Sequence, residues 1–305
     1  MTERDQLLDR LRSNAFEIAY RMLGSVAEAE DVVQESLLRV HQALERGEQI
    51  AAPHSYVATV ATRLSINQLQ SARARREQYV GEWLPEPIIT DGRDDPAQHA
   101  EMADSLSMAL LATLESLSPE QRAVLLLHDV FDYGYAEIAR IIGKSESNAR
   151  QLAARARKHV AERRPRFTPT REQQEELAAR FFEAAARGDL AGLEAVLAAD
   201  VEMVGDGGGK VPALTRMVQG RSRVARTLLN WFRLGQRTPG VSLRLVEVNG
   251  ARGAVYLDPQ QRIFGVVSLE ISDGQIKAIR TILNPDKLAH LGPVGDYVSL
   301  LRPPE

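Results

Sequence analysis

Residues 135–158, YAEIARIIGKSESNARQLAARARK, contain two short helical patterns separated by a glycine. In the first pattern Ile138, Ala139 and Ile142 share one face, and Gly143 then permits a sharp turn. Ser145 is a suitable N-cap for the second pattern. The second pattern carries small and apolar residues on one face: Ala149, Leu152, Ala153 and Ala156. Because small residues let two helices cross closely, this spacing predicts a helix-turn-helix.

Polar side chains fill the outer face of the second helix. They are Ser145, Glu146, Ser147, Asn148, Arg150 and Gln151, followed by Arg155 and Lys158. In a helix-turn-helix the first turns of this helix face base edges in the major groove. Asn and Gln can pair with adenine and Arg with guanine, whereas cations further along suit phosphates. The pattern predicts DNA binding; an ordinary solvated helix face is the structural alternative.

The motif lies in a chain with three kinds of segment. Residues 1–79 and 100–164 have helical periodicity, and Ser118-Pro119-Glu120-Gln121 marks a helix start. Between them, residues 80–99 contain Trp83-Leu84-Pro85-Glu86-Pro87, which cannot lie inside a helix, so we expect an interdomain linker there. Residues 170–290 form a third predicted domain, and residues 291–305 a tail.

The third domain changes from helices to strands. Helices are expected over 172–187, 190–198 and 224–232, and strands over 201–204, 243–248, 253–257, 263–271 and 276–283. Asn249-Gly250 and Asp273-Gly274 are hairpin turn signals. This order predicts an α+β domain with a curved antiparallel sheet.

Composition restricts the possible functions. The 305 residues include no cysteine, which excludes disulfides and thiolate metal sites, and the six histidines show no metal-binding spacing, so we expect no metal and no cofactor. The absence of a long apolar run or a signal-like start predicts a cytoplasmic protein that does not bind membranes. The net charge of −3 suggests that the free chain binds DNA weakly and that a partner supplies further contacts.

The second helical block resembles region four of bacterial sigma factors. The resemblance rests on Leu117–Arg122, Tyr135–Ala139, Asn148–Leu152 and Arg155–Arg157. It implies that this block binds the minus-thirty-five promoter element and docks on RNA polymerase.

The first block resembles region two of the same family. Ala29–Arg39 resembles the helix that binds core RNA polymerase, and Asp31, Gln34, Glu35 and Leu38 fall on one stripe of it. By spacing alone this stripe could equally be a solvated face.

Ser55–Leu69 resembles the minus-ten helix of the extracytoplasmic-function (ECF) group. The minus-ten residues implied are Arg63, Asn67, Gln68, Ser71 and Arg73. Many members of the ECF group have Arg-Asn where this chain has Thr62-Arg63, and Asp where this chain has Asn67. The arginines at the end of this helix would contact DNA phosphates. The competing interpretation is that they only stabilise the helix, because cations are favourable at a helix C-terminus. Two blocks in this order, with no region-three domain between them, is the ECF layout.

The third domain resembles a SnoaL-like α+β cone, which some ECF sigma factors carry. Three strings resemble that subgroup: the linker residues Trp83, Leu84, Pro85, Glu86 and Pro87; the loop residues Asp206, Gly207, Gly208, Gly209 and Lys210; and the sequence Asn284, Pro285, Asp286, Lys287, Leu288. We hypothesise that the glycine loop packs on the Trp83 linker, sets the distance between the two DNA-binding blocks and so regulates the chain in cis.

Two alternatives concern this third domain. The cone could bind a small apolar ligand as a signal, or it could be an enzyme. The whole chain could also be a helix-turn-helix regulator that never joins polymerase, with such a ligand-binding or enzymatic cone. Acid–base candidates would be Asp206, Asp258 or Glu202, but no paired acid and base occurs at a suggestive spacing. The loop at Gly207 lacks the spacing of a nucleotide-phosphate loop. We therefore expect no catalytic residues.

Overall fold

The computed structural model describes residues 3–76, 79–91, 106–161, 170–236 and 238–300. It forms two compact units. The helical unit comprises residues 1–78 and 110–163, and the cone unit comprises residues 79–109 and 164–305. The segment expected to be an interdomain linker therefore belongs, where it is described, to the same compact unit as the C-terminal domain.

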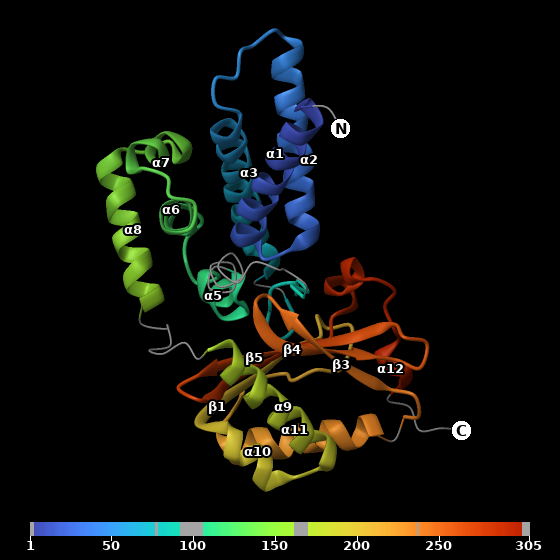
Figure 1. Ribbon diagram of the computed structural model, residues 1–305. Coiled ribbons are helices and arrows are strands. Elements are labelled where there is room, and N and C mark those ends of the chain that lie inside the picture. Colours follow the sequence, from blue (N-terminus) through green and yellow to red (C-terminus); the bar gives the residue numbers. More distant parts are fainter. Residues whose placement is uncertain (1–2, 77–78, 92–105, 162–169, 237, 301–305) are drawn as a thin grey trace. The chain divides into compact units, whose positions relative to one another are not determined.

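The helical unit begins with three long helices that pack side by side (Figure 1). They are α1 (Glu3–Leu23), α2 (Val26–Glu45) and α3 (Pro53–Arg76). Apolar positions at helical spacing, such as Ile18, Val33 and Val57, are fully buried between them. The Ser25 hydroxyl accepts a hydrogen bond from Glu28 N at 3.2 Å and so fixes the start of α2.

The chain then forms α5 (Met108–Leu114), whose first two residues belong to the cone unit, followed in the helical unit by α6 (Pro119–Asp129), α7 (Tyr135–Ile142) and α8 (Glu146–Ala161). The predicted start of α6 is confirmed, because Ser118 and Gln121 form a reciprocal capping box. The helix-turn-helix is also confirmed. Gly143 ends α7 in the left-handed conformation with φ of 67°, and Ala149 and Ala153 of α8 are fully buried against Ile138.

The cone unit contains a six-stranded sheet in the order β2-β1-β6-β5-β4-β3. Its strands are β1 (Leu197–Asp206), β2 (Val218–Gln219), β3 (Ser242–Val248), β4 (Ala251–Leu257), β5 (Ile263–Ser272) and β6 (Gln275–Ile282). The α+β class is confirmed, but the expectation of an antiparallel sheet is wrong, since β1 and β6 pair in parallel. The sheet is mixed because a long crossover returns the chain to the side of β1, and turn signals alone do not reveal such a pairing.

The hairpins were predictable from local sequence. Asn249 and Gly250 both have positive φ, as do Asp273 and Gly274, as two-residue hairpin turns require. The helix predicted over 190–198 is two residues shorter in the structure, because α10 (Leu190–Val196) ends where Leu197 begins β1.

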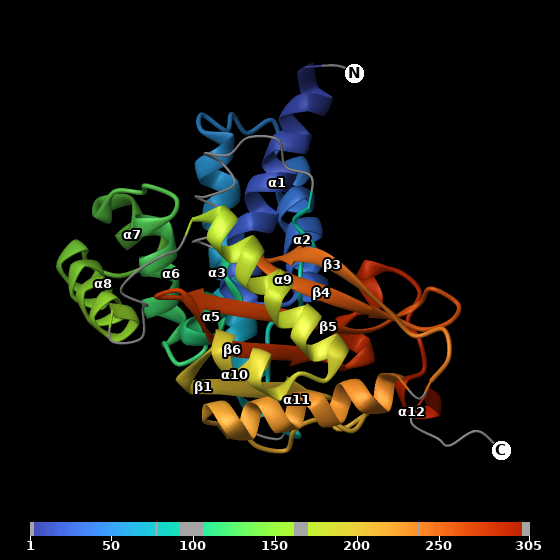
Figure 2. The ribbon, with the colours of Figure 1, turned by 60° about the horizontal axis from the view of Figure 1, so that its bottom comes forward.

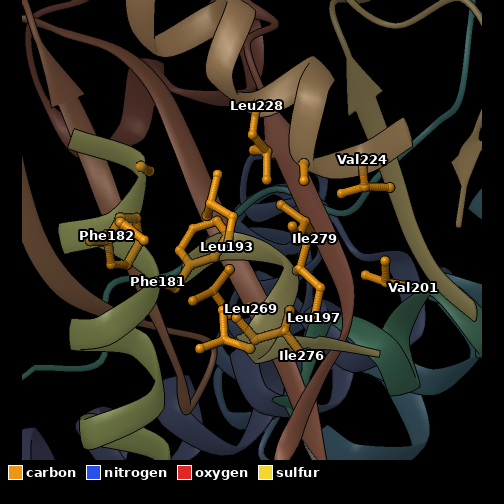
Figure 3. Close-up of a cluster of buried hydrophobic side chains, with 14 of the residues drawn as sticks. Phe181, Phe182, Leu193, Leu197, Val201, Val224, Leu228, Leu269, Ile276 and Ile279 are labelled. Atoms are coloured by element: carbon orange, nitrogen blue, oxygen red, sulfur yellow. The ribbon is translucent and has the colours of Figure 1, made fainter. Parts of the chain in front are cut away.

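Side chains of the sheet alternate between two buried layers. On one face α9 (Arg171–Arg187), α10 and α11 (Arg221–Gln236) cover a core that includes Phe181, Leu193 and Leu228 (Figures 2 and 3). On the other face Val255 and Val266 pack with Leu84, Met108 and residues near the chain end. Leu84 and Met108, which lie between the two helical blocks in the sequence, thus complete the second core of the cone.

Candidate nucleic-acid interface and the docked segment

The outer face of α8 is accessible along its whole length. The predicted DNA-binding residues Ser145, Glu146, Ser147, Asn148, Arg150, Gln151, Arg155 and Lys158 are all exposed. Ser145 Oγ accepts a hydrogen bond from Asn148 N at 3.2 Å, so its hydroxyl caps the helix. Arg150 pairs with Glu146 at 2.5 Å and stacks over Tyr135 of α7, which orients its guanidinium beside the first turn.

An ion pair anchors α8 to α6. Arg157 Nε donates to Asp129 Oδ2 at 2.9 Å, and the imidazole of His128 lies beside both groups. Burial opposes ionisation of Asp129, but its hydrogen bonds and the charges of Arg157 and His128 outweigh burial and lower its pKa below the ordinary value. Arg157 therefore fixes the position of α8 and is less available to DNA than its neighbours.

The predicted polymerase-binding stripe lies on the outer side of α2. Asp31, Gln34 and Leu38 are exposed and Glu35 is half-exposed, while Val32, Val33 and Ser36 are buried. Leu38 leaves 48% of its surface accessible. Glu35 pairs with Arg39 at 2.7 Å. The stripe is thus an accessible surface with an apolar residue among polar ones.

The predicted minus-ten residues lie along α3. Asn67 and Ser71 are exposed and Gln68 is half-buried, whereas the side chain of Arg73 lies outside the described residues. Arg63 is engaged within the unit. Its guanidinium donates to the carbonyl oxygens of Ile141 and Arg140, at 2.8 and 2.9 Å, where α7 ends. Sequence alone gave no signal of this contact between α3 and the first helix of the helix-turn-helix.

A buried arginine makes a second connection in the helical unit. Arg122 of α6 donates to the carbonyl oxygens of Met22 and Leu114 and to Glu115. Its side chain is only 3% exposed, and burial lowers its pKa to about 9. Arg122 thereby ties α6 to the end of α1 by hydrogen bonds that only a multidentate donor can make.

Residues 79–91, called here the docked segment, lie against the cone sheet within the same unit. Asp206, at the end of β1, is completely buried and is the main contact. Its carboxylate accepts from Tyr79 Oη at 2.6 Å, from Leu84 N at 2.8 Å and from Gly208 N at 3.0 Å. These bonds satisfy a charge that would otherwise be costly to bury.

Lys287 supplies the opposite charge. Its Nζ atom lies 2.6 Å from Asp206 Oδ2 and also donates to Leu84 O. The same ammonium lies 4.2 Å from the centre of the Trp83 ring and 5.0 Å from that of Tyr79. Burial of Tyr79, its hydrogen bond to Asp206 and the negative charge of Asp206 raise the pKa of the Tyr79 hydroxyl, so it remains a donor. The segment is thus held through both its backbone and its aromatic rings.

A further set of contacts holds the second half of the docked segment. Asn249 Oδ1 accepts from Ile88 N at 2.9 Å, Ile89 forms a β-bridge with Val248, and Thr90 Oγ1 donates to Glu247 at 2.7 Å. His290 Nε2 lies 2.7 Å from Pro87 O. The sequence did not indicate Tyr79, Glu247, Asn249 or His290, since their role depends on segments 127 to 205 residues apart coming together.

The glycine loop also contacts the segment. Gly208 and Gly209 have φ of 61° and 71°, and a Cβ at Gly208 would lie 2.3 Å from Asn284 Nδ2. Asn284 Nδ2 itself donates to Tyr79 Oη at 2.9 Å. Lys210 pairs with Asp286 at the surface at 2.5 Å. Within the motif, Leu84, Pro85, Glu86 and Pro87 are buried and Trp83 is half-buried. The structure therefore brings together the three strings singled out in the sequence.

The three acidic residues considered for catalysis have other surroundings. Asp206 binds the docked segment, and Asp258 binds Arg262 and the turn amides around it. Glu202 lies on β1 opposite Gln219. None of the three lines the cavity of the cone. In the described part of the chain, no cluster of three or more metal-ligating side chains occurs, and no helix could cross a membrane.

Comparisons with known proteins show which family contains both helical regions of this chain. Sigma-70 region 2 matches residues 7–75, and sigma-70 region 4 matches residues 107–160. The ECF RNA polymerase sigma factor SigJ of Mycobacterium tuberculosis is 38% identical over 290 residues, which cover 92% of this chain and 91% of SigJ. The chain belongs to the ECF RNA polymerase sigma factors. The probable ECF sigma factor SigI of the same species is 32% identical over 281 residues, covering 91% of this chain and 92% of SigI.

The tertiary structure agrees with this family. The crystal structure of SigJ superimposes on the present sigma factor with a TM-score of 0.75 and 36% identity, covering 94% of this chain and 98% of SigJ. The resemblance drawn from the sequence is confirmed: sigma regions two and four are followed by an α+β domain with a six-stranded sheet. Sigma factors bind core RNA polymerase and promoter DNA and are not enzymes, which sets aside the alternative of a regulator that never joins polymerase.

Proposed function

We propose that this sigma factor initiates transcription with its cone acting as a built-in regulator through the docked segment. The supporting observation is the buried carboxylate of Asp206, which binds the hydroxyl of Tyr79, the amide of Leu84 and the ammonium of Lys287. The docked segment is part of the covalent connection from region two, which ends at residue 75, to region four, which begins at residue 107. A domain that holds this connection restricts how far apart the two DNA-binding regions can be placed.

Each sigma region has its own role in the proposal. The stripe of Asp31, Gln34, Glu35 and Leu38 binds core polymerase, with exposed Leu38 as the apolar centre of the contact. The minus-ten element is bound by Arg63, Asn67, Gln68, Ser71 and Arg73. The exposed face of α8 binds the minus-thirty-five element, with Asn148, Arg150 and Gln151 at base edges and Arg155 and Lys158 at phosphates. Arg63 must leave the end of α7 before it can contact DNA.

The test measures which promoter geometries are used. Core polymerase is combined with the full-length sigma factor and a library of promoters in which the spacer between the two elements varies in length. We expect Asp206→Ala to broaden the range of spacers transcribed, because the docked segment loses its main anchor. Removal of residues after Pro169 should have the same effect, since the sheet that binds the segment is then missing.

Asp258→Ala is the matched control. Asp258 is also a buried aspartate of the cone paired with a cation, Arg262, but it stabilises a hairpin turn and not the docked segment. It should leave the spacer profile unchanged. Wild-type spacer profiles for Asp206→Ala and for the truncated chain would contradict regulation in cis while leaving the sigma-factor function intact.

A further inference from the structure

The cone contains an apolar cavity of about 250 Å³ on the sheet face that the helices cover. Its walls come from α9, α11, five strands and α12 (Tyr297–Leu300). Phe181 and Leu228, which border it, are among the buried side chains drawn in Figure 3. The volume exceeds the roughly 150 Å³ of an apolar cavity that admits benzene, and lies near the lower end of the range for small-molecule sites.

Aromatic rings are concentrated around this cavity. The chain has only seven Phe, seven Tyr and two Trp, and six of these residues line the cavity: Phe181, Trp231, Phe232, Tyr256, Phe264 and Tyr297. Tyr256 stacks on Phe264 with centroids 5.8 Å apart, and Phe264 on Tyr297 at 5.7 Å. A wall of parallel rings offers flat surfaces on which a planar molecule can stack.

The polarity of the lining limits the ligand further. No charged side chain is among the described residues that line the cavity. The polar side-chain groups of the lining residues are the hydroxyls of Thr238, Ser242, Tyr256, Thr281 and Tyr297 and the indole N–H of Trp231. The Thr238 hydroxyl donates to Leu300 O at 3.1 Å. Burial raises the pKa of Tyr256 and Tyr297, which keeps both phenols neutral. A charged ligand would have no counter-ion here.

The cavity and the docked segment share strands. Met203 of β1 lines the cavity, and Asp206 follows three residues later on the same strand. Leu283 lines the cavity beside Asn284, and both donate their backbone amides to Asp206 O, at 2.8 and 3.0 Å. A ligand that displaces Leu283 or Met203 therefore acts directly on the strand ends that hold Tyr79 and Leu84.

We propose that this cavity binds an uncharged, planar aromatic molecule and that its occupation alters how the docked segment is held. The second part rests on the proposed function, whereas the binding site stands by itself. The ligand would thus change the connection between regions two and four from within the cone.

The binding test uses the full-length protein and two probes with the same ring system, naphthol and naphthalene sulfonate. Calorimetric titration should show saturable binding of naphthol, and an affinity for the sulfonate weaker by on the order of tenfold or more, which corresponds to about 1.4 kcal/mol. Equal affinity for the two probes, or no binding of naphthol, would overturn the site as described.

Two substitutions on β3 locate the binding. Leu243 lines the cavity, whereas Leu245 lies two residues further on the same strand and is 54% exposed outside it. Leu243→Phe should fill part of the cavity and weaken naphthol binding by about tenfold, and Leu245→Phe should not. Thermal unfolding of both variants verifies folding. Equal effects of the two substitutions would show that naphthol binds elsewhere.

Hydrogen exchange of residues 79–91 tests the coupling. We expect saturating naphthol to change the exchange rate of the docked segment in the wild type and not in Leu243→Phe. Binding without such a change would overturn the coupling and retain the ligand site. If Asp206→Ala keeps the wild-type spacer profile while naphthol still changes the exchange rate of residues 79–91, the proposed regulation of transcription is refuted and the ligand site is retained.

Discussion

The Nζ atom of Lys287 lies 2.6 Å from Oδ2 of Asp206, and the two side chains are 7% and 0% exposed. The pair joins the end of β1 to the 3-10 helix η1 (Pro285–Lys287), which follows β6. Between them they bind the hydroxyl of Tyr79 and both the amide and the carbonyl of Leu84. Docking of the first half of the segment, residues 79–84, thus depends on one ion pair shielded from water.

Replacing Lys287 by Met should destabilise the cone strongly. The buried carboxylate of Asp206 would lose its counter-ion, a change that typically costs about 3–5 kcal/mol. Lys210→Met is the control, because Lys210 and its partner Asp286 are 53% and 64% exposed and such surface pairs contribute about 0–1 kcal/mol. Urea unfolding of the full-length variants measures both. Similar losses would mean that Lys287 contributes no more than a surface residue.

Gly208→Ala should weaken docking beyond the general cost of an alanine at positive φ. The new Cβ would lie 2.3 Å from Asn284 Nδ2, the group that binds Tyr79 Oη. Gly188 has φ of 72° with open space around it, so Gly188→Ala carries only the conformational cost of about 1 kcal/mol. Hydrogen exchange at residues 79–91 should rise in Gly208→Ala alone. A rise in both variants would indicate a general loss of stability.

Asp129 should make the helical unit sensitive to acid. Its pKa in the folded state is lower than in the unfolded chain, so its stabilising effect is complete above the unfolded value of about 4 and is lost as the pH falls through the folded value. Asp129→Asn should flatten this part of the profile of unfolding free energy against pH. Glu146→Gln, at an exposed pair, serves as control and should leave the profile near that of the wild type.

Two kinds of substitution on α8 should differ in their effect on promoter choice. Asn148→Ala should relax the base preference at one position of the minus-thirty-five element, at a cost of about 1–3 kcal/mol for the preferred base. Lys158→Ala should weaken all sequences to a similar extent and reduce the dependence on salt. Transcription of a randomised element by holoenzyme, sequenced and counted, measures both. A uniform loss with Asn148→Ala would place this side chain away from the bases.

The sequence determined the local elements of this protein because their signals lie within a few residues of each other. Ser118 and Gln121 cap α6, Gly143 takes the left-handed conformation between α7 and α8, and Asn249-Gly250 forms its hairpin turn. The ordered pair of sigma regions was equally recognisable, since each is a continuous stretch of helices. These features need no knowledge of distant contacts.

Tertiary structure alone decided what the motif residues contact. The parallel pairing of β1 with β6, the engagement of Arg63 by the end of α7 and the ring wall of Tyr256, Phe264 and Tyr297 all join distant segments. The sequence suggested that the loop at Asp206 packs on the Trp83 linker, but it did not show which residues of the loop and the linker bind each other. In the structure the partner of Asp206 is Lys287. An unpaired buried charge is costly, so the two charges are stable in this core only as a pair, and the docked segment binds at that pair.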